Sequence, residues 1–200
     1  MTAVLLAPGA GADRNQSSLV ALDTALSGAG LTVARMDFPY RKAGRRAPDR
    51  EPVLLDAVRA EAAALCDEDL VLGGRSMGGR ICSMAVAAAL PATALVLVSY
   101  PLHPPGRTEK LRTAHFPDLH VPCLFVSGTR DTFGTPAEME AATAAIPGPV
   151  THVWIEGKDH GLRGCDTRVV EAVLEWLTPI VARPAGGPAG PKPRPRRTKR

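Results

Sequence analysis

The stretch Asp69-Leu-Val-Leu-Gly-Gly-Arg-Ser-Met-Gly-Gly-Arg80 decides the fold of this chain. An apolar run ends at Gly73, glycines flank a serine at position 76, and an alanine-rich segment with helical spacing follows. The residues Gly74 to Gly78 fit the pattern G-x-S-x-G at a junction between a strand and a helix. The flanking glycines would let the strand and the helix approach closely, with Ser76 at the amino end of the helix. The stretch therefore predicts a sharp turn that projects a serine hydroxyl.

Apolar runs like the one before Ser76 recur along the chain and predict further strands. They lie at Val4–Ala7, Leu31–Met36, Ala94–Ser99, Pro122–Ser127 and Val150–Glu156. Segments between them have apolar residues three and four apart and predict helices, the first capped by Ser17 or Ser18 and others ending before Pro91 and Pro179. This alternation indicates a doubly wound α/β protein with a mostly parallel sheet and helices on both faces. Ligands of such sheets bind beyond the carboxyl ends of the strands.

The composition indicates one globular domain, residues 1–181, followed by a tail. The 200 residues are 45% hydrophobic and 22% charged, which suits a single soluble domain. From Ala182 the chain is rich in Pro and Gly, so we expect a disordered basic tail over residues 182–200. The seven Lys and Arg from Arg183 onward leave 17 of the 24 basic and all 20 acidic residues in the domain, a net charge of −3. A nucleic-acid contact is thus expected only weakly and only through the tail.

The cysteines and the amino-terminal segment predict where in the cell the protein is found. The four cysteines are Cys66, Cys82, Cys123 and Cys165. They form no CxxC pair and lie in or beside apolar segments, which predicts buried free thiols in a reducing, cytoplasmic compartment. The run from Ala3 to Pro8 follows no positive residue and is too short to cross a bilayer, so we expect a first strand and no membrane contact.

Serine attack requires a histidine base, and His160 is the best candidate. It lies in Glu156-Gly-Lys-Asp-His160-Gly-Leu162, after the last predicted strand and before the last helix. Its ring could therefore reach the same edge of the sheet as Ser76. The other histidines lie in the long connection, as His103 does, or inside a strand, as His152 does.

A carboxylate must orient the histidine, and two aspartates compete for this role. Asp131 follows the predicted strand that ends at Ser127, while Asp159 adjoins His160. Adjacent residues rarely aim their side chains at each other, so we expect Asp131 to orient the ring. For the oxyanion, the pattern predicts the amide of Met77 and a second amide, near Ala10 or Gly11, in the glycine-rich loop after the first strand.

Several segments resemble the small α/β-hydrolases related to dienelactone hydrolases, in the group that includes a testis-expressed protein and a chromatin-complex subunit. The matching segments are Leu6-Ala-Pro-Gly-Ala-Gly-Ala12, Phe38-Pro-Tyr40, Gly73-Gly-Arg-Ser-Met-Gly-Gly-Arg80, Tyr100-Pro-Leu-His-Pro-Pro-Gly106 and Gly157-Lys-Asp-His160. The resemblance implies a six-stranded sheet and a Ser76–Asp131–His160 triad, the chain order expected of α/β-hydrolases. Relatives usually have His where this chain has Pro8.

The function predicted is a cofactor-independent serine hydrolase that cleaves carboxylic esters or thioesters of a small molecule through an acyl-enzyme. The connection from Ser99 to Pro122 is too short for a large cap, so the site should be open. We expect Gly11, Tyr40, Arg75, Tyr100, Leu102 and His103 to line it. The basic cluster Arg41, Lys42, Arg45 and Arg46 could attract an acidic substrate or form only a solvated loop.

Other interpretations of the same residues remain. The glycines around Ser76 could form an inert turn, although their spacing fits neither GxGxxG nor a Walker loop. A zinc site from His115, Asp118 and His120 is possible by residue type, but its spacing matches no standard pattern. The main alternative function is a pseudo-hydrolase that serves as a binding or scaffolding module.

Overall fold

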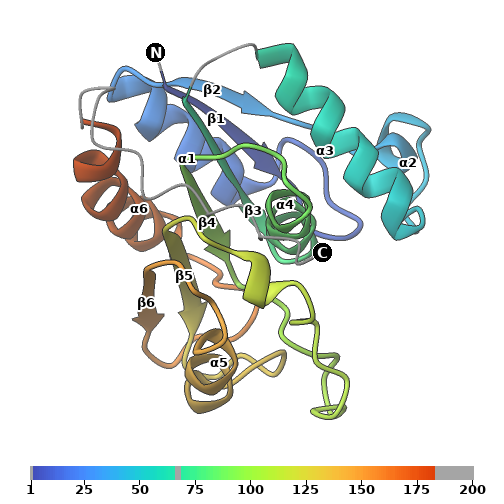
Figure 1. Cartoon of the computed structure of the whole chain (residues 1–200), viewed down its shortest axis with the longest axis vertical. Helices are drawn as coiled ribbons and strands as arrows, with labels where there is room; N and C mark the ends of the chain where they lie inside the picture. The colour runs from blue at the N-terminus through green and yellow to red at the C-terminus, as the bar shows by residue number, and fades with distance from the viewer. Residues whose placement is uncertain (1, 66–68, 183–200) are drawn as a thin grey trace, which may run out of the picture.

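Six strands form a single, wholly parallel sheet in the order β2-β1-β3-β4-β5-β6 (Figure 1). The computed structural model describes residues 2–65 and 69–182. The strands are β1 (Thr2–Ala7), β2 (Thr32–Arg35), β3 (Asp69–Arg75), β4 (Ala94–Val98), β5 (Cys123–Gly128) and β6 (Val150–Ile155). All six predicted strands and the α/β-hydrolase fold class are confirmed. Because the strands are parallel, their carboxyl ends share one edge of the sheet.

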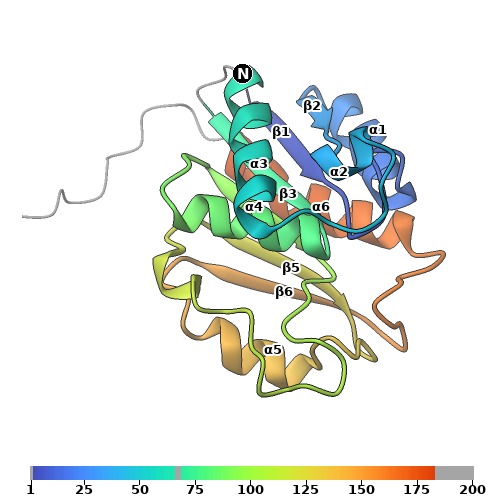
Figure 2. The same cartoon turned by 90° about the vertical axis from the view of Figure 1, so that its right-hand side faces the viewer.

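Helices cover both faces of the sheet. They are α1 (Ser17–Gly28), α2 (Pro39–Lys42), α3 (Glu51–Leu65), α4 (Met77–Ala87), the 3-10 helix η1 (Phe116–Asp118), α5 (Pro136–Thr143) and α6 (Asp166–Val181). Helices α1 and α6 pack on one face, and α3 and α4 pack on the other (Figures 1 and 2). The connection from β4 to β5 contains only η1, so no large cap covers the carboxyl edge of the sheet.

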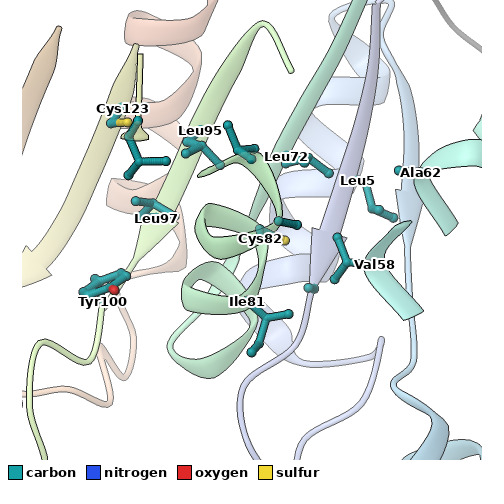
Figure 3. Close-up of a cluster of buried hydrophobic side chains, with 14 of the residues drawn as sticks. Leu5, Val58, Ala62, Leu72, Ile81, Cys82, Leu95, Leu97, Tyr100 and Cys123 are labelled. Atoms are coloured by element: carbon teal, nitrogen blue, oxygen red, sulfur yellow. The ribbon is translucent and has the colours of Figure 1, made fainter. Parts of the chain in front are cut away.

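The core has two layers because strand side chains alternate between the faces. Leu5 of β1 lies in the layer under α3 and α4, while its neighbours Val4 and Leu6 lie in the layer under α1 and α6. Figure 3 shows Val58 of α3 and Cys82 of α4 among the strand side chains of the first layer. The aliphatic residues that the sequence offers therefore bury both faces and fix the strands that carry the site.

Two local predictions were wrong, and one helix was not predicted. Helix α1 begins after Gln16 with no side-chain cap, so neither Ser17 nor Ser18 serves as its cap. Helix α6 continues past Pro179 to Val181, since a proline in the last turn removes only one backbone hydrogen bond. Helix α5 was not expected from the pattern; a capping box between Thr135 and Glu138 begins it.

Cys82, Cys123 and Cys165 are buried free thiols, as predicted, and burial raises the pKa of the Cys82 and Cys123 thiols to about 12. Cys66 and the tail from Arg183 lie outside the described residues. Of the helices in the described part of the chain, none combines the length and the apolar character that crossing a membrane requires.

Candidate active site

Ser76 occupies the sharp turn between β3 and α4. Its backbone has φ 49° and ψ −116°, a conformation that a non-glycine residue rarely adopts and that costs about 1–3 kcal/mol. Two backbone hydrogen bonds hold it there: the Ser76 amide donates to Val98 O at 2.8 Å, and the Arg80 amide donates to Ser76 O at 3.1 Å. The turn therefore fixes Ser76 at the amino end of α4 and at the edge of the sheet.

The two glycines of the motif are needed because backbones meet at this turn. A Cβ on Gly74 would collide with the carbonyl oxygen of Ala7, and a Cβ on Gly78 would collide with the main chain of Ala7 and Pro8. Helix α4 thus begins directly against the end of β1. This close approach brings the loop after β1 beside Ser76.

The structure brings Ser76, His160 and Asp131 together in one hydrogen-bonded chain. Ser76 Oγ lies 2.9 Å from His160 Nε2, and His160 Nδ1 lies 2.8 Å and 3.0 Å from the two carboxylate oxygens of Asp131. The Asp131 side chain is 1% exposed and the His160 side chain 21%. With Nδ1–H donating to Asp131, Nε2 is free to accept the Ser76 proton.

A close contact between two loops holds His160 beside Asp131. A Cβ on Gly128, the last residue of β5, would collide with the main chain of Lys158 and lie 2.9 Å from Asp159 O. In the same contact the Arg130 amide donates to Lys158 O at 2.8 Å. The two loops can approach only because residue 128 has no side chain.

Two further side chains restrain the His160 loop and ring. A guanidinium nitrogen of Arg75 donates to the main-chain carbonyl of His160. The Phe133 ring stacks on the imidazole with centroids 4.1 Å apart, and the Phe133 amide donates to Asp131 Oδ1 at 2.8 Å. Burial lowers the pKa of Arg75, with nearby aspartates acting in the opposite direction. Arg75 therefore restrains the backbone of the His160 loop, while Phe133 contacts both the His160 ring and the Asp131 carboxylate.

In the loop after β1, the amide of Ala10 is available to the site. The Gly9 amide donates to Gln16 Oε1 at 3.0 Å, the Gly11 amide to Tyr40 Oη at 3.1 Å, and the Ala12 amide to Gly9 O at 3.1 Å. Ala10 lines the cleft over Ser76, and its amide has no partner within the described part of the chain. Met77, the first residue of α4, also lines the cleft, and an amide at this position has no partner inside the helix.

A cleft of about 480 Å³ opens over Ser76, a size that suits a small-molecule ligand. Arg75 lines it as predicted, together with Ala10, Ser76, Met77 and His160. The sequence pattern missed Gln16, Arg80, Arg112 and Phe133, which also line the cleft. Gln16, Arg112 and Phe133 come from segments that no local motif links to the serine. Arg80 lies in the serine motif stretch, four residues after Ser76, but the pattern alone does not say which side chains of that helix face the cleft.

Five predicted lining residues lie elsewhere. Tyr100 and Leu102 are fully buried in the core, where the Tyr100 hydroxyl donates to Arg112 O at 2.6 Å. His103 is 3% exposed and faces Pro104 O and Glu138, and Tyr40 is buried beneath the β1 loop, where it holds Gly11. These four side chains follow strands near the site but turn back into the core. Gly11, the fifth, is exposed in the loop after β1 but does not line the cleft.

The other candidate residues from the sequence, namely Asp159, the possible zinc ligands and the basic cluster, have other roles in the structure. Asp159 accepts the amide of Gly161 at 2.9 Å and so caps its own turn. His115 contacts Ser83 Oγ at 2.8 Å, and over residues 2–65 and 69–182 no group of three or more His, Cys, Asp or Glu side chains could hold a metal ion. In the basic cluster, Arg41, Lys42 and Arg45 form ion pairs with Asp13, Glu61 and Asp49. Three of the four basic side chains are therefore salt-bridged, and none of the four, Arg46 included, lines the cleft.

Comparison with known proteins identifies the family of this chain. A family model described as an alpha/beta hydrolase domain matches residues 1–172. Among solved structures, Est1E from Butyrivibrio proteoclasticus, with ferulic acid bound, has a TM-score of 0.79 at 16% identity and covers 92% of this chain and 90% of its own. The dienelactone hydrolase from Anabaena variabilis has a TM-score of 0.71 at 20% identity, with 88% and 85% covered. An alpha-beta serine hydrolase homologue from Coxiella burnetii has a TM-score of 0.72 at 22% identity, with 88% and 84% covered. These three likenesses concern the fold, and the family match over most of the chain shows that it belongs to the α/β-hydrolases.

Proposed function

We propose that this protein is a serine hydrolase that cleaves carboxylic esters or thioesters through an acyl-enzyme. The observation that carries the proposal is the chain of short contacts from Ser76 Oγ through His160 to Asp131, at a strained turn that opens into a cleft. In an inactive binding module, nothing would require this backbone strain and this hydrogen-bonded order together.

The reaction proceeds in two halves. Ser76 Oγ attacks the substrate carbonyl while His160 Nε2 takes the hydroxyl proton, and Asp131 stabilises the imidazolium that forms. The tetrahedral intermediate collapses, the alcohol or thiol leaves with the proton from His160, and Ser76 carries the acyl group. Water then attacks the acyl-enzyme with His160 again as base, which releases the carboxylic acid and restores the serine.

The amides of Ala10 and Met77 form the oxyanion hole in this proposal. Both residues line the cleft, and the Ala10 amide is free to donate, whereas the amides of Gly9, Gly11 and Ala12 already donate within the protein. Donors held in place before the reaction stabilise the developing negative charge without reorganisation. The amino end of α4 adds its dipole at the same point.

Several finer inferences accompany the main proposal. The motifs shared with the testis-expressed and chromatin-complex group support placing the chain near that group within the family. Its buried free thiols support a reducing, cytoplasmic location. We infer that the domain ends near residue 181 and that the basic tail beyond it contributes solubility and weak electrostatic contacts.

Labelling with a fluorophosphonate probe tests the proposal. The full-length protein should be labelled stoichiometrically at Ser76 and should hydrolyse short 4-nitrophenyl esters, whereas Ser76→Ala should do neither. Ser17→Ala, which removes an exposed serine at the start of α1, is the matched control and should behave as wild type. Absence of labelling in the folded wild-type protein would refute the hydrolase and favour the binding module.

A further inference from the structure

Arginines give the cleft a positive character. Arg75, Arg80 and Arg112 all line it, and no Asp or Glu of the described residues does. The overall charge of the domain is negative, so this local excess is not a reflection of composition.

Arg75 and Arg80 are partly accounted for by protein partners. Arg75 donates to the carbonyl of His160 and thereby acts as a positioning residue. Arg80 lies one helical turn beyond Ser76 on α4, with its side chain 20% exposed, and its Nη1 lies 3.1 Å from Glu51 Oε2. The Glu51 side chain is 45% exposed, so water screens this ion pair and leaves much of the Arg80 charge available to the cleft.

Arg112 has no carboxylate within ion-pair distance among residues 2–65 and 69–182. Two hydrogen bonds fix the Arg112 backbone: its amide donates to Leu102 O at 2.8 Å, and its carbonyl accepts from Tyr100 Oη. The guanidinium makes only a long hydrogen bond, from Nη1 to Pro101 O at 3.4 Å. Burial lowers the pKa of Arg112, and the positive charge of Arg80 lowers it further. A half-buried cation beside a second cation is unfavourable unless an anion joins them.

We propose that Arg80 and Arg112 form an anion-binding subsite of the cleft, so that the preferred substrate is an ester or thioester bearing a carboxylate near the scissile bond. This inference rests on the proposed hydrolase function. A carboxylate would accept hydrogen bonds from both guanidinium groups, whose planar donors suit its two oxygens. It would also relieve the repulsion between the two arginines, which a neutral substrate would not.

Two matched substrate pairs test the subsite and show on which side of the bond the anion lies. For the acyl side, 4-nitrophenyl hydrogen glutarate is compared with its neutral methyl ester; for the leaving group, 4-acetoxybenzoate is compared with its methyl ester. We expect kcat/KM to favour the anion by about tenfold in one pair, the contribution of a hydrogen bond to a charged group. In Arg112→Gln this ratio should fall to near one, and added salt should lower it in the wild type. Arg107→Gln, an exposed arginine of the same connection outside the cleft, should keep the wild-type ratio.

A binding measurement separates failure of the subsite from failure of the hydrolase. Monomethyl glutarate should bind the folded Ser76→Ala variant in ligand-observed NMR, and this binding should disappear when Arg80→Gln and Arg112→Gln are added. Equal hydrolysis of both members of both pairs would overturn the subsite while leaving the hydrolase intact. Undiminished binding after removal of both arginines would overturn it even if no ester is hydrolysed.

Discussion

Replacement of Gly128 by alanine should separate His160 from its partners. The new Cβ would meet the main chain of Lys158 and Asp159, and main-chain atoms cannot rotate away as the end of a flexible side chain can. The loop that carries His160 would have to retreat by about 1 Å to reach ordinary van der Waals separation. This movement would break the 2.8 Å bond from the Arg130 amide to Lys158 O.

Gly128→Ala should lower both the stability of the protein and its catalytic rate. Overpacking of this kind destabilises a protein by about 1–3 kcal/mol, which should appear in chemical denaturation. A catalytic group displaced by about 1 Å can cost roughly 100-fold in rate, so kcat/KM for 4-nitrophenyl acetate and the rate of fluorophosphonate labelling should fall by about that factor. Both rates are measured on protein shown to be folded by circular dichroism.

Gly157→Ala is the matched control because it changes the same loop without a collision. Gly157 has φ +71° and no atom within 4 Å of a built Cβ, so alanine there introduces backbone strain of about 1–2 kcal/mol only. This variant should lose stability but keep kcat/KM within about threefold. A folded Gly128→Ala protein that also stays within threefold of wild type would refute the argument that this glycine positions His160.

Three other perturbations follow from the same geometry. Asp131→Asn should lower kcat/KM by about 10³- to 10⁴-fold with little loss of fold, because the amide favours the wrong tautomer of His160; a loss below tenfold would contradict the assigned role. Tyr40→Phe should destabilise the protein by about 1–3 kcal/mol in urea denaturation, since the Gly11 amide loses its acceptor; a change within 0.5 kcal/mol, on the order of a neutral surface substitution, would contradict this. Burial lowers the pKa of His115 from 6.5 to about 4, so the unfolded state binds more protons and stability should fall as the pH drops from 6.5 toward 4. The loss at pH 5 should be about 1 kcal/mol after solvent screening, and His115→Gln should have a smaller pH dependence between pH 7 and 5.

Much of the fold could be read from local patterns because burial imposes periodicity. The six apolar runs became the six strands, since a strand covered on both faces needs apolar side chains along its whole length. Helix α5 was not predicted because it is short and has no clear apolar stripe; its main sequence signal is the capping box at its start. The predicted end of α6 before Pro179 was wrong because a proline in the last turn of a helix does not end it.

The order of residues along the chain by itself determined the serine turn, the strand-end positions of Asp131 and His160, and the glycine-rich loop that contains Ala10. These follow from local backbone requirements and from the rule that parallel strands end at one edge. Only the tertiary structure decided that Gly128 lets the loops meet, that Tyr100 and Leu102 turn inward, and that Arg80 and Arg112 share the cleft. Such features depend on distances between segments far apart in the chain, and spacing within one segment carries no information about those distances.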